Sequence, residues 1–254
     1  MCPTVGTSGL TLGGGVGPLG GLHGATSDQL LSVEMVTGTG EILNVSATEH
    51  PDLFYGIKGA GFNYGVVTSL KYRIHPATNA GKITVINAMF PASLNGSVWA
   101  AANTYVGSQP KELSILFAIR FNETLGGMSF TGTFIYFGPE ETALEVLKPF
   151  LDLSPLHVEV NTAGYDNFSS VALYGEVAAI GPMKGIDFAP YTINLYQVDV
   201  KNLVSVFDYM NTTLTANPDV LSATLSWAQY PTDGFLKYPL DSSAFPYRDV
   251  VVYL

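Results

Sequence analysis

The chain has 254 residues, of which 47% are hydrophobic, and a formal net charge of −10 at pH 7. This length allows one large domain or two modest ones, and the composition supplies enough apolar residues for a core. The 11 basic residues are scattered, which argues against a nucleic-acid-binding face with clustered Lys and Arg. No run approaches the roughly 18 consecutive apolar residues of a membrane span, so we expect a soluble acidic protein that binds neither nucleic acid nor membrane.

The N-terminal third contains a glycine-rich stretch followed by a hairpin pattern. Residues 1–31 have little periodicity and are interpreted as a loop-rich layer. Residues 33–37 and 41–45 flank Gly38-Thr39-Gly40, which predicts a β-hairpin with a glycine turn. Residues 51–57 then favour a short helix, with Asp52 in its first turn.

A strand is predicted over residues 66–74, before the point where the predicted pattern of strands and helices changes. Alternation there places Val66, Thr68, Leu70, Tyr72 and Ile74 on one face. The following segment, 75–81, contains His, Pro, Asn and Gly and ends this unit. We therefore expect one domain over residues 1–80 and a second over 81–254.

The second part alternates strands and helices in an order that predicts a fold class. Strands are expected at 83–90, 113–121, 128–137, 156–161, 221–230 and 248–254, and helices at 93–106, 139–151 and 200–215. The first six of these elements read βαββαβ, which predicts an α+β fold with helices on one face of an antiparallel sheet. The chain ends inside the last predicted strand, so we expect the protein to continue beyond it.

The only cysteine, Cys2, precedes Pro3-Thr4-Val5-Gly6 and a loop with Gly13-Gly14-Gly15-Val16-Gly17. A single cysteine excludes a disulfide within this chain, and an unpaired thiol is usually a buried, inert residue. A thiol beside backbone that lacks side chains could also bond to a flat, phosphate-bearing cofactor. The motif begins one residue after the start of the chain, which indicates that residues preceding it are missing.

Other catalytic motifs find no support in the sequence. Gly15-x-Gly17-x-x-Gly20 matches the dinucleotide fingerprint formally, but that fingerprint requires a preceding strand and a helix that opens at the glycines, and no helix of useful length is expected among these glycines and Pro18. The four histidines have no metal-ligand spacing, so no metal site is predicted. Neither GxSxG nor GxxxxGK occurs, which argues against ordinary hydrolases and kinases.

The sequence contains five sequons for N-linked glycosylation. They begin at Asn44, Asn95, Asn122, Asn167 and Asn211. This number favours the secretory pathway and a secreted, extracellular glycoprotein. Residues 1–3 do not form a signal peptide, which again indicates a missing N-terminus.

The segment from Cys2 to Gly17 resembles the flavin-attachment segment of the berberine bridge enzyme-like FAD-linked oxidases, which are of the vanillyl-alcohol oxidase type. The resemblance continues in family order through Asp28, residues 36–41, 51–54 and 58–68. It implies the second half of a PCMH-type FAD-binding domain, followed by a substrate domain. It also implies a fragment that lacks the N-terminal FAD subdomain, with its flavin-linking histidine, and a C-terminal segment with a catalytic tyrosine.

The same resemblance implies roles for individual residues. Cys2 would bond through sulfur to C6 of the isoalloxazine of FAD, and Val5 would occupy the position that gates oxygen access. The full set of cofactor-binding positions is Cys2, Pro3, Thr4, Val5, Gly6, Gly9, Gly13, Gly14, Gly15, Gly17, Asn63, Gly65 and Val67. The catalytic base has no counterpart that can be assigned. Trp227, Gln229 and Arg248 are interpreted as ordinary sheet residues rather than as the floor of a substrate site.

The implied function is an oxidase that transfers a hydride from an alcohol, sugar or secondary metabolite to covalently bound FAD, and then reduces O₂ to H₂O₂. Its partners would be a small-molecule substrate and O₂. One alternative is a dehydrogenase of the same family with a different electron acceptor. Another is a truncated product without catalytic activity. The sequence leaves the substrate and the oligomeric state open.

Overall fold

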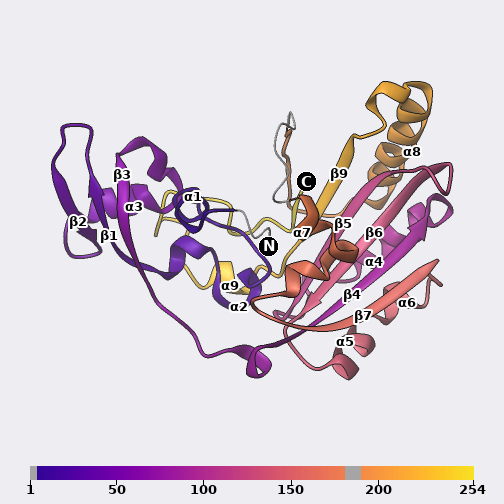
Figure 1. Ribbon diagram of the computed structural model, residues 1–254, viewed down its shortest axis with the longest axis horizontal. Coiled ribbons are helices and arrows are strands. Elements are labelled where there is room, and N and C mark those ends of the chain that lie inside the picture. The colour runs from indigo at the N-terminus through magenta and orange to yellow at the C-terminus, as the bar shows by residue number, and fades with distance from the viewer. Residues whose placement is uncertain (1–4, 181–189) are drawn as a thin grey trace. The chain divides into compact units, whose positions relative to one another are not determined.

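The computed structural model describes residues 5–180 and 190–254, and the chain divides into two compact units (Figure 1). Unit 1 comprises the described residues up to Ala77 together with Thr232–Asp249. Unit 2 comprises Thr78–Pro231 and Val250–Leu254. The sequence analysis assigned all of 81–254 to one domain, whereas residues 232–249 pack within unit 1. Within the described ranges, no helix has the length and apolar character needed to cross a membrane.

Unit 1 is built on a three-stranded antiparallel sheet. Its strands are β1 (Leu30–Val36), β2 (Ile42–Ser46) and β3 (Val66–Tyr72), in the order β2-β1-β3. The predicted hairpin is confirmed, because β1 pairs with β2 across the glycine turn. The predicted short helix is α3 (Pro51–Ala60), which has Pro51 in its first turn. The core of the unit consists of Leu12, Leu30, Val33, Met35, Val45, Phe54 and Ile57.

The predicted face of β3 is correct for Leu70 and Tyr72, which pack against the core, and wrong for Val66 and Thr68, which are exposed; a β-bulge explains the difference. Ser69 pairs with Glu34 and Val67 pairs with Met35, so Thr68 is an extra residue on β3. A bulge of one residue reverses the side-chain alternation beyond it. As a result Val67 packs against the core, while Val66 is 70% exposed. Ile74 lies beyond the end of the strand and is also exposed.

The glycine-rich stretch, predicted to be a loop-rich layer, also contains short helices. They are α1 (Thr7–Leu12), α2 (Gly20–His23) and the 3-10 turn η1 (Thr26–Gln29). Unit 1 also contains η2 (Gly61–Asn63) and α9 (Asp233–Leu236). Helix α1 is stabilised by burial of Thr11 and Leu12, and Leu12 belongs to the core of the unit. Tertiary packing of this kind outweighs the low helix propensity of glycine.

Unit 2 contains a seven-stranded sheet in which every pair of neighbouring strands is antiparallel. Its order is β7-β4-β6-β5-β9-β10-β8, with β4 (Lys82–Pro91), β5 (Leu113–Asn122), β6 (Gly127–Tyr136), β7 (His157–Gly164), β8 (Asn194–Leu195), β9 (Thr224–Gln229) and β10 (Val252–Tyr253). The α+β prediction is confirmed. The strand expected over 248–254 shortens to β10, because the chain up to Asp249 belongs to unit 1.

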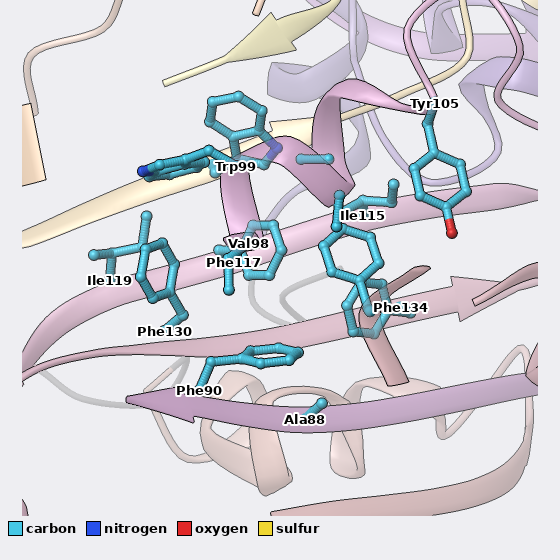
Figure 2. Packing of buried hydrophobic residues seen from close by; sticks show 14 of the residues in the cluster. Ala88, Phe90, Val98, Trp99, Tyr105, Ile115, Phe117, Ile119, Phe130 and Phe134 are labelled. Carbon is cyan, nitrogen blue, oxygen red and sulfur yellow. The ribbon is translucent and has the colours of Figure 1, made fainter. Parts of the chain in front are cut away.

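One face of this sheet is covered by helices around an aromatic core (Figure 2). The helices are α4 (Asn95–Asn103), α5 (Glu140–Val146), α6 (Lys148–Leu151) and α8 (Val200–Ala216). The Trp99 ring of α4 packs edge-on against Phe130 at 5.0 Å, and Phe130 stacks on Phe207 of α8 at 4.8 Å between centroids. Such pairs add to the free energy gained by burying apolar area.

The helix predicted over 139–151 breaks into α5 and α6 at Leu147. Pro149 causes the break, since its ring has no N–H and clashes with the carbonyl of the preceding turn. The remaining 3-10 turns of unit 2 are η3 (Thr78–Gly81), η4 (Ala92–Leu94), η5 (Phe168–Ser170), η6 (Ala172–Gly175) and η7 (Pro218–Val220).

The opposite face of the sheet holds a helical segment that the sequence did not predict, composed of η5, η6 and α7 (Glu176–Ile180). Hydrogen bonds fix it there: Asn87 donates to the carbonyl of Val171 at 2.7 Å, and the Leu173 amide donates to Thr133 at 2.8 Å. Arg120 of β5 also forms an ion pair with Glu176. Polar contacts therefore hold this segment, in contrast to the apolar packing on the aromatic face.

Gly65→Ala tests the backbone at the start of β3. Gly65 has φ of +146°, and a Cβ there would collide with the Val36 carbonyl oxygen. Since both features oppose any side chain, we expect unit 1 to lose about 1–3 kcal/mol of stability. Urea denaturation of the two proteins measures the difference. Gly38→Ala is the control, because nothing lies within 4 Å of its Cβ position; equal midpoints for the two variants would contradict the strained geometry.

Candidate functional site

The glycine-rich segment folds back on itself through hydrogen bonds of its own backbone. The carbonyls of Gly14 and Gly15 accept hydrogen bonds from the amides of Ser27 and Thr26, each at 2.8 Å. Gly14 has φ of +105°, and a Cβ there would collide with the ring of Phe245. A side chain is thus excluded at Gly14 by both backbone conformation and packing.

This segment forms one wall of a pocket within unit 1, with a volume of about 300 Å³. Tyr72, Arg73 and His75, which follow one another at and beyond the end of β3, also line the pocket. The complete lining is Thr7, residues 15–20, residues 23–26, Gln29, Tyr72, Arg73 and His75. Among the described residues this lining includes no Asp or Glu. The pocket therefore combines bare backbone and a largely apolar surface with Arg73 and neutral hydrogen-bond donors.

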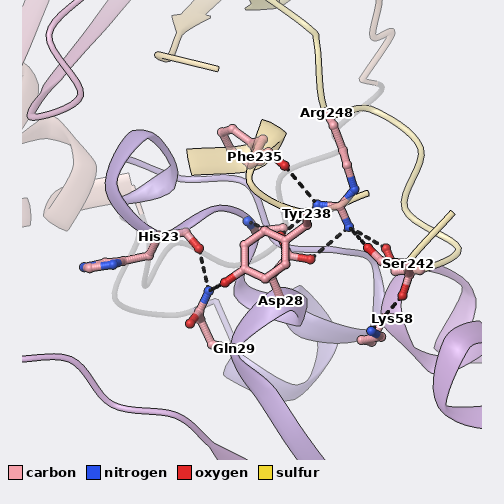
Figure 3. Close-up of polar contacts among 10 residues, drawn as sticks. His23, Asp28, Gln29, Lys58, Phe235, Tyr238, Ser242 and Arg248 are labelled. Carbon is pink, nitrogen blue, oxygen red and sulfur yellow. Dashed lines mark hydrogen bonds and ion pairs between the residues drawn. The ribbon is translucent and has the colours of Figure 1, made fainter. Parts of the chain in front are cut away.

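Two imidazoles and one amide organise the polar side of the pocket. The rings of His23 and His75 stack with centroids 4.0 Å apart. Gln29 lies between them and Tyr238: its Nε2 donates to the His23 carbonyl at 2.5 Å and to the Tyr238 hydroxyl at 3.1 Å (Figure 3). The Gln29 Oε1 then accepts from His75 Nε2 at 2.7 Å. This arrangement requires a proton on Nε2 of His75.

Burial lowers the pKa of His23 below its ordinary value, and the neighbouring His75 and Lys237 lower it further. The folded chain thus favours the neutral imidazole at position 23. The neutral His23 imidazole contributes fully to the stability of the folded chain above pH 6.5, and this contribution is lost as the pH falls through the lowered pKa. At neutral pH the stacked pair does not carry two positive charges, which permits the close contact of the rings.

A buried ion pair fixes the glycine-rich segment to the C-terminal segment of unit 1. The side chains of Arg248 and Asp28 are 0% and 1% exposed, and two hydrogen bonds of 2.9 Å join them (Figure 3). Asp28 also accepts from the Ala25 amide at 2.9 Å, and Arg248 donates to Ser243 at 2.7 Å. The pair is bidentate and supported on both sides, as a buried pair must be.

A second cation supports the same C-terminal segment. Lys58 donates from Nζ to the carbonyl of Ser242 at 2.8 Å. Burial lowers the pKa of Lys58, and the charge of Arg248 lowers it further, against the opposing effect of Asp28. Lys58 therefore binds the segment as a hydrogen-bond donor in a half-buried position. Sequence analysis found neither this contact nor the Asp28–Arg248 pair, because no local pattern links residues so far apart.

The predicted site residues occupy different environments. Cys2, Pro3 and Thr4 lie outside the described residues. Val5 is 54% exposed, and Gly15 and Gly17 line the pocket. Three further glycines, Gly6, Gly9 and Gly13, are exposed on and around α1, next to the buried Gly14.

The other three predicted cofactor-binding residues, Asn63, Gly65 and Val67, do not line the pocket. Asn63 is exposed and donates to the carbonyl of Ala60 in its own turn at 3.1 Å. Gly65 immediately precedes β3, and Val67 packs against the core of unit 1. Their contact with a cofactor remains a prediction.

Of the three residues interpreted as ordinary sheet residues, Trp227 and Gln229 lie in a strand of unit 2 and Arg248 does not. Trp227 belongs to the aromatic core, and Gln229 donates to the Ala102 carbonyl of α4 at 3.1 Å, so both face the helices of unit 2. Arg248 lies outside any strand, in unit 1. Its assignment to a strand is wrong because its guanidinium pairs with Asp28.

Comparisons with known proteins support the resemblance found in the sequence. No family model matches the chain. The FAD-linked oxidoreductase azaG of Aspergillus niger is 36% identical over 254 residues, which cover 99% of this chain and 54% of that protein. The FAD-linked oxidoreductase OXR1 of Pyricularia oryzae is 34% identical over 100% of this chain and 49% of its own length. The chain thus spans about half the length of the curated relatives it matches.

Solved structures agree on the fold. The berberine bridge enzyme-like protein 1 of Physcomitrella patens has a TM-score of 0.77 at 21% identity, covering 99% of this chain and 54% of that one. A xylooligosaccharide oxidase from Myceliophthora thermophila has a TM-score of 0.78 at 21% identity, covering 100% and 55%. The chain is thus related to the FAD-linked oxidoreductases and has the berberine bridge enzyme-like fold, as its sequence motifs predicted.

Asp28→Asn tests the buried pair. The substitution leaves the guanidinium of Arg248 buried without its countercharge, so we expect a loss of about 3–5 kcal/mol of stability. Chemical denaturation monitored by tyrosine and tryptophan fluorescence measures it. Glu145→Gln, which breaks the exposed ion pair with Lys148, is the matched control and should leave the midpoint unchanged. If Asp28→Asn lowered the free energy of unfolding no more than the control does, the Asp28–Arg248 pair would be accessible to solvent, contrary to the structure.

Proposed function

We propose that this chain is part of an FAD-linked oxidoreductase in which unit 1 binds FAD and unit 2 contributes to the substrate site. The observation that carries the proposal is the glycine-rich segment, which combines the Cys2–Gly17 motif with a pocket wall of bare backbone. The relatives named FAD-linked oxidoreductase, which match almost the whole chain, support the same assignment.

Features of unit 1 fit such a cofactor. Within the described residues, nothing lies within 4 Å of the Cβ positions of Gly6 and Gly9. Glycine inside a helix costs about 1 kcal/mol relative to alanine, yet no internal contact requires it at Gly9 of α1. An external molecule that lies against this backbone accounts for the glycines. The pocket volume of about 300 Å³ is at the lower end for ligand sites, so it suits one part of FAD rather than the whole.

The residues that would hold FAD are those implied by the resemblance. Cys2 would form a thioether at C6 of the isoalloxazine: the S–H and C6–H bonds are replaced by a C–S bond, and O₂ takes up the two electrons and two protons as H₂O₂. Pro3 and Thr4 would lie alongside the ring, and Gly15 and Gly17 would approach the cofactor with their backbone. Bound FAD supplies the acceptor for a hydride from the substrate.

The proposed reaction is that of an oxidase. A substrate alcohol, sugar or secondary metabolite loses a hydride and a proton, and O₂ is reduced to H₂O₂. Several similar structures are named as oxidases of carbohydrates, among them the xylooligosaccharide oxidase and the carbohydrate oxidase from Microdochium nivale, and this favours a hydroxylated substrate. The small Val5 favours O₂ as acceptor over a quinone.

Cys2→Ala tests covalent flavin binding. We expect flavin absorbance to remain with acid-precipitated wild-type chain and to be lost from the precipitate of the variant, because the chain has no other thiol. Absorbance spectra before and after precipitation measure it. Gly38→Ala, in the hairpin turn, is the control and should retain the flavin. Wild-type protein without bound flavin, or a variant that keeps it through precipitation, would contradict the proposal.

Val5→Leu tests the oxygen gate. A larger side chain at this position should slow reoxidation of the reduced protein by O₂ about tenfold, which corresponds to ~1.4 kcal/mol of barrier. Reoxidation by a soluble quinone should change much less, because it does not depend on access of O₂ to the ring. Stopped-flow absorbance with each acceptor separates the two rates. An equal effect on both acceptors would argue against a gate, and faster reaction of wild type with quinone than with O₂ would favour the dehydrogenase alternative.

A further inference from the structure

We propose that the fold leaves Asn44 and Asn167 open as acceptors of N-linked glycans and closes the sequon at Asn95 to them. The proposal concerns the chain on the secretory route that its five sequons indicate, and it does not depend on the cofactor. A glycan is bonded to the side-chain nitrogen of asparagine and is large and hydrophilic, so it must extend into solvent. The burial and hydrogen bonding of each asparagine therefore determine whether the folded chain can carry a glycan at that sequon.

Asn95 cannot carry a glycan in the folded chain, because its side chain is both buried and hydrogen-bonded. It begins α4 and is only 6% exposed. Its Nδ2 donates to the Val204 carbonyl at 3.3 Å and to Asp208 Oδ1 at 3.2 Å, and both acceptors belong to α8. A sugar on this nitrogen would separate α4 from α8 and open the aromatic core beneath them.

Asn44 is open. It lies on β2, the edge strand of the three-stranded sheet, opposite the exposed Glu34. Its own side chain is exposed, and no hydrogen bond to its Nδ2 occurs within the described residues. A glycan at this edge would also hinder pairing with a strand of another chain.

Asn167 is open in a different way. It is exposed in the turn after β7, where its Oδ1 accepts a hydrogen bond from the Gly164 amide at 2.7 Å. A glycosylated asparagine keeps its carbonyl oxygen, so this bond can persist while the nitrogen carries the sugar. The turn thus presents the acceptor nitrogen without a structural cost.

The other two sequon asparagines are half-buried and fall between these extremes. Asn122 Oδ1 accepts from the Leu125 amide at 3.1 Å, and Asn211 Oδ1 accepts from the Met128 amide at 3.3 Å. The proposal makes no assignment for these two. The test compares Asn44 and Asn167, which are accessible, with Asn95, which is buried.

The test is site-by-site glycan mapping of the chain secreted from yeast behind a heterologous leader. Size-exclusion chromatography separates monomer from aggregate, and enzymatic release of glycans in ¹⁸O-water followed by mass spectrometry marks each formerly glycosylated asparagine. In the monomer we expect glycans at Asn44 and Asn167 and an unmodified Asn95. Chains glycosylated at Asn95 should appear only in the aggregate.

Matched variants make the result independent of peptide recovery. Asn44→Gln and Ser169→Ala should each remove one glycan from the monomer, as seen by gel mobility. Ser97→Ala destroys the Asn95 sequon without touching the hydrogen bonds of Asn95 and should remove none, since Ser97 is exposed. Monomeric protein with a glycan at Asn95, or without glycans at Asn44 or Asn167, would overturn the proposal.

Discussion

The buried ion pair between Asp28 and Arg248 is the constraint on which unit 1 depends. It joins the end of the glycine-rich segment to a segment that is distant in sequence, and it does so with almost no exposure to solvent. Desolvation makes such a pair a weak source of net stability, but an incorrect partner would leave a buried charge. The pair therefore selects one arrangement of the two segments over others.

This arrangement gives the glycines of unit 1 two distinct explanations. At Gly14 and Gly20 a Cβ would collide with Phe245 and Phe235 of the C-terminal segment, so internal packing requires glycine there. At Gly6 and Gly9 no internal contact among the described residues imposes the same requirement. The first pair shapes the segment, and the second pair leaves backbone open on α1. That difference is the physical basis for assigning the open side to a cofactor.

The sequence predicted what depends on local pattern and missed what depends on distant partners. The hairpin, the antiparallel sheet of unit 2 and α8 followed from alternation and helical periodicity. The bulge at Thr68 did not, because nothing within β3 distinguishes it from an ordinary strand residue. The return of residues 232–249 to unit 1 and the buried position of Arg248 were also missed, since both are set by tertiary packing.

In the candidate site, too, the sequence predicted the part that depends on a local motif and missed the part that depends on residues distant in sequence. The motif that starts at Cys2 pointed to the glycine-rich segment as a cofactor wall, and two of its glycines line the pocket. The stacked His23 and His75 and the amide of Gln29 were not predicted, because histidines 52 positions apart have no recognisable spacing. A search for polar residues at the end of β3 could have suggested His75.

Hydrogen-exchange mass spectrometry with and without FAD tests the central claim most directly. If unit 1 binds the cofactor through its glycine-rich segment, FAD should slow exchange in peptides from residues 5–26 and leave the sheet of unit 2 unchanged. Unchanged exchange over residues 5–26 at saturating FAD, or protection confined to unit 2, would contradict the account.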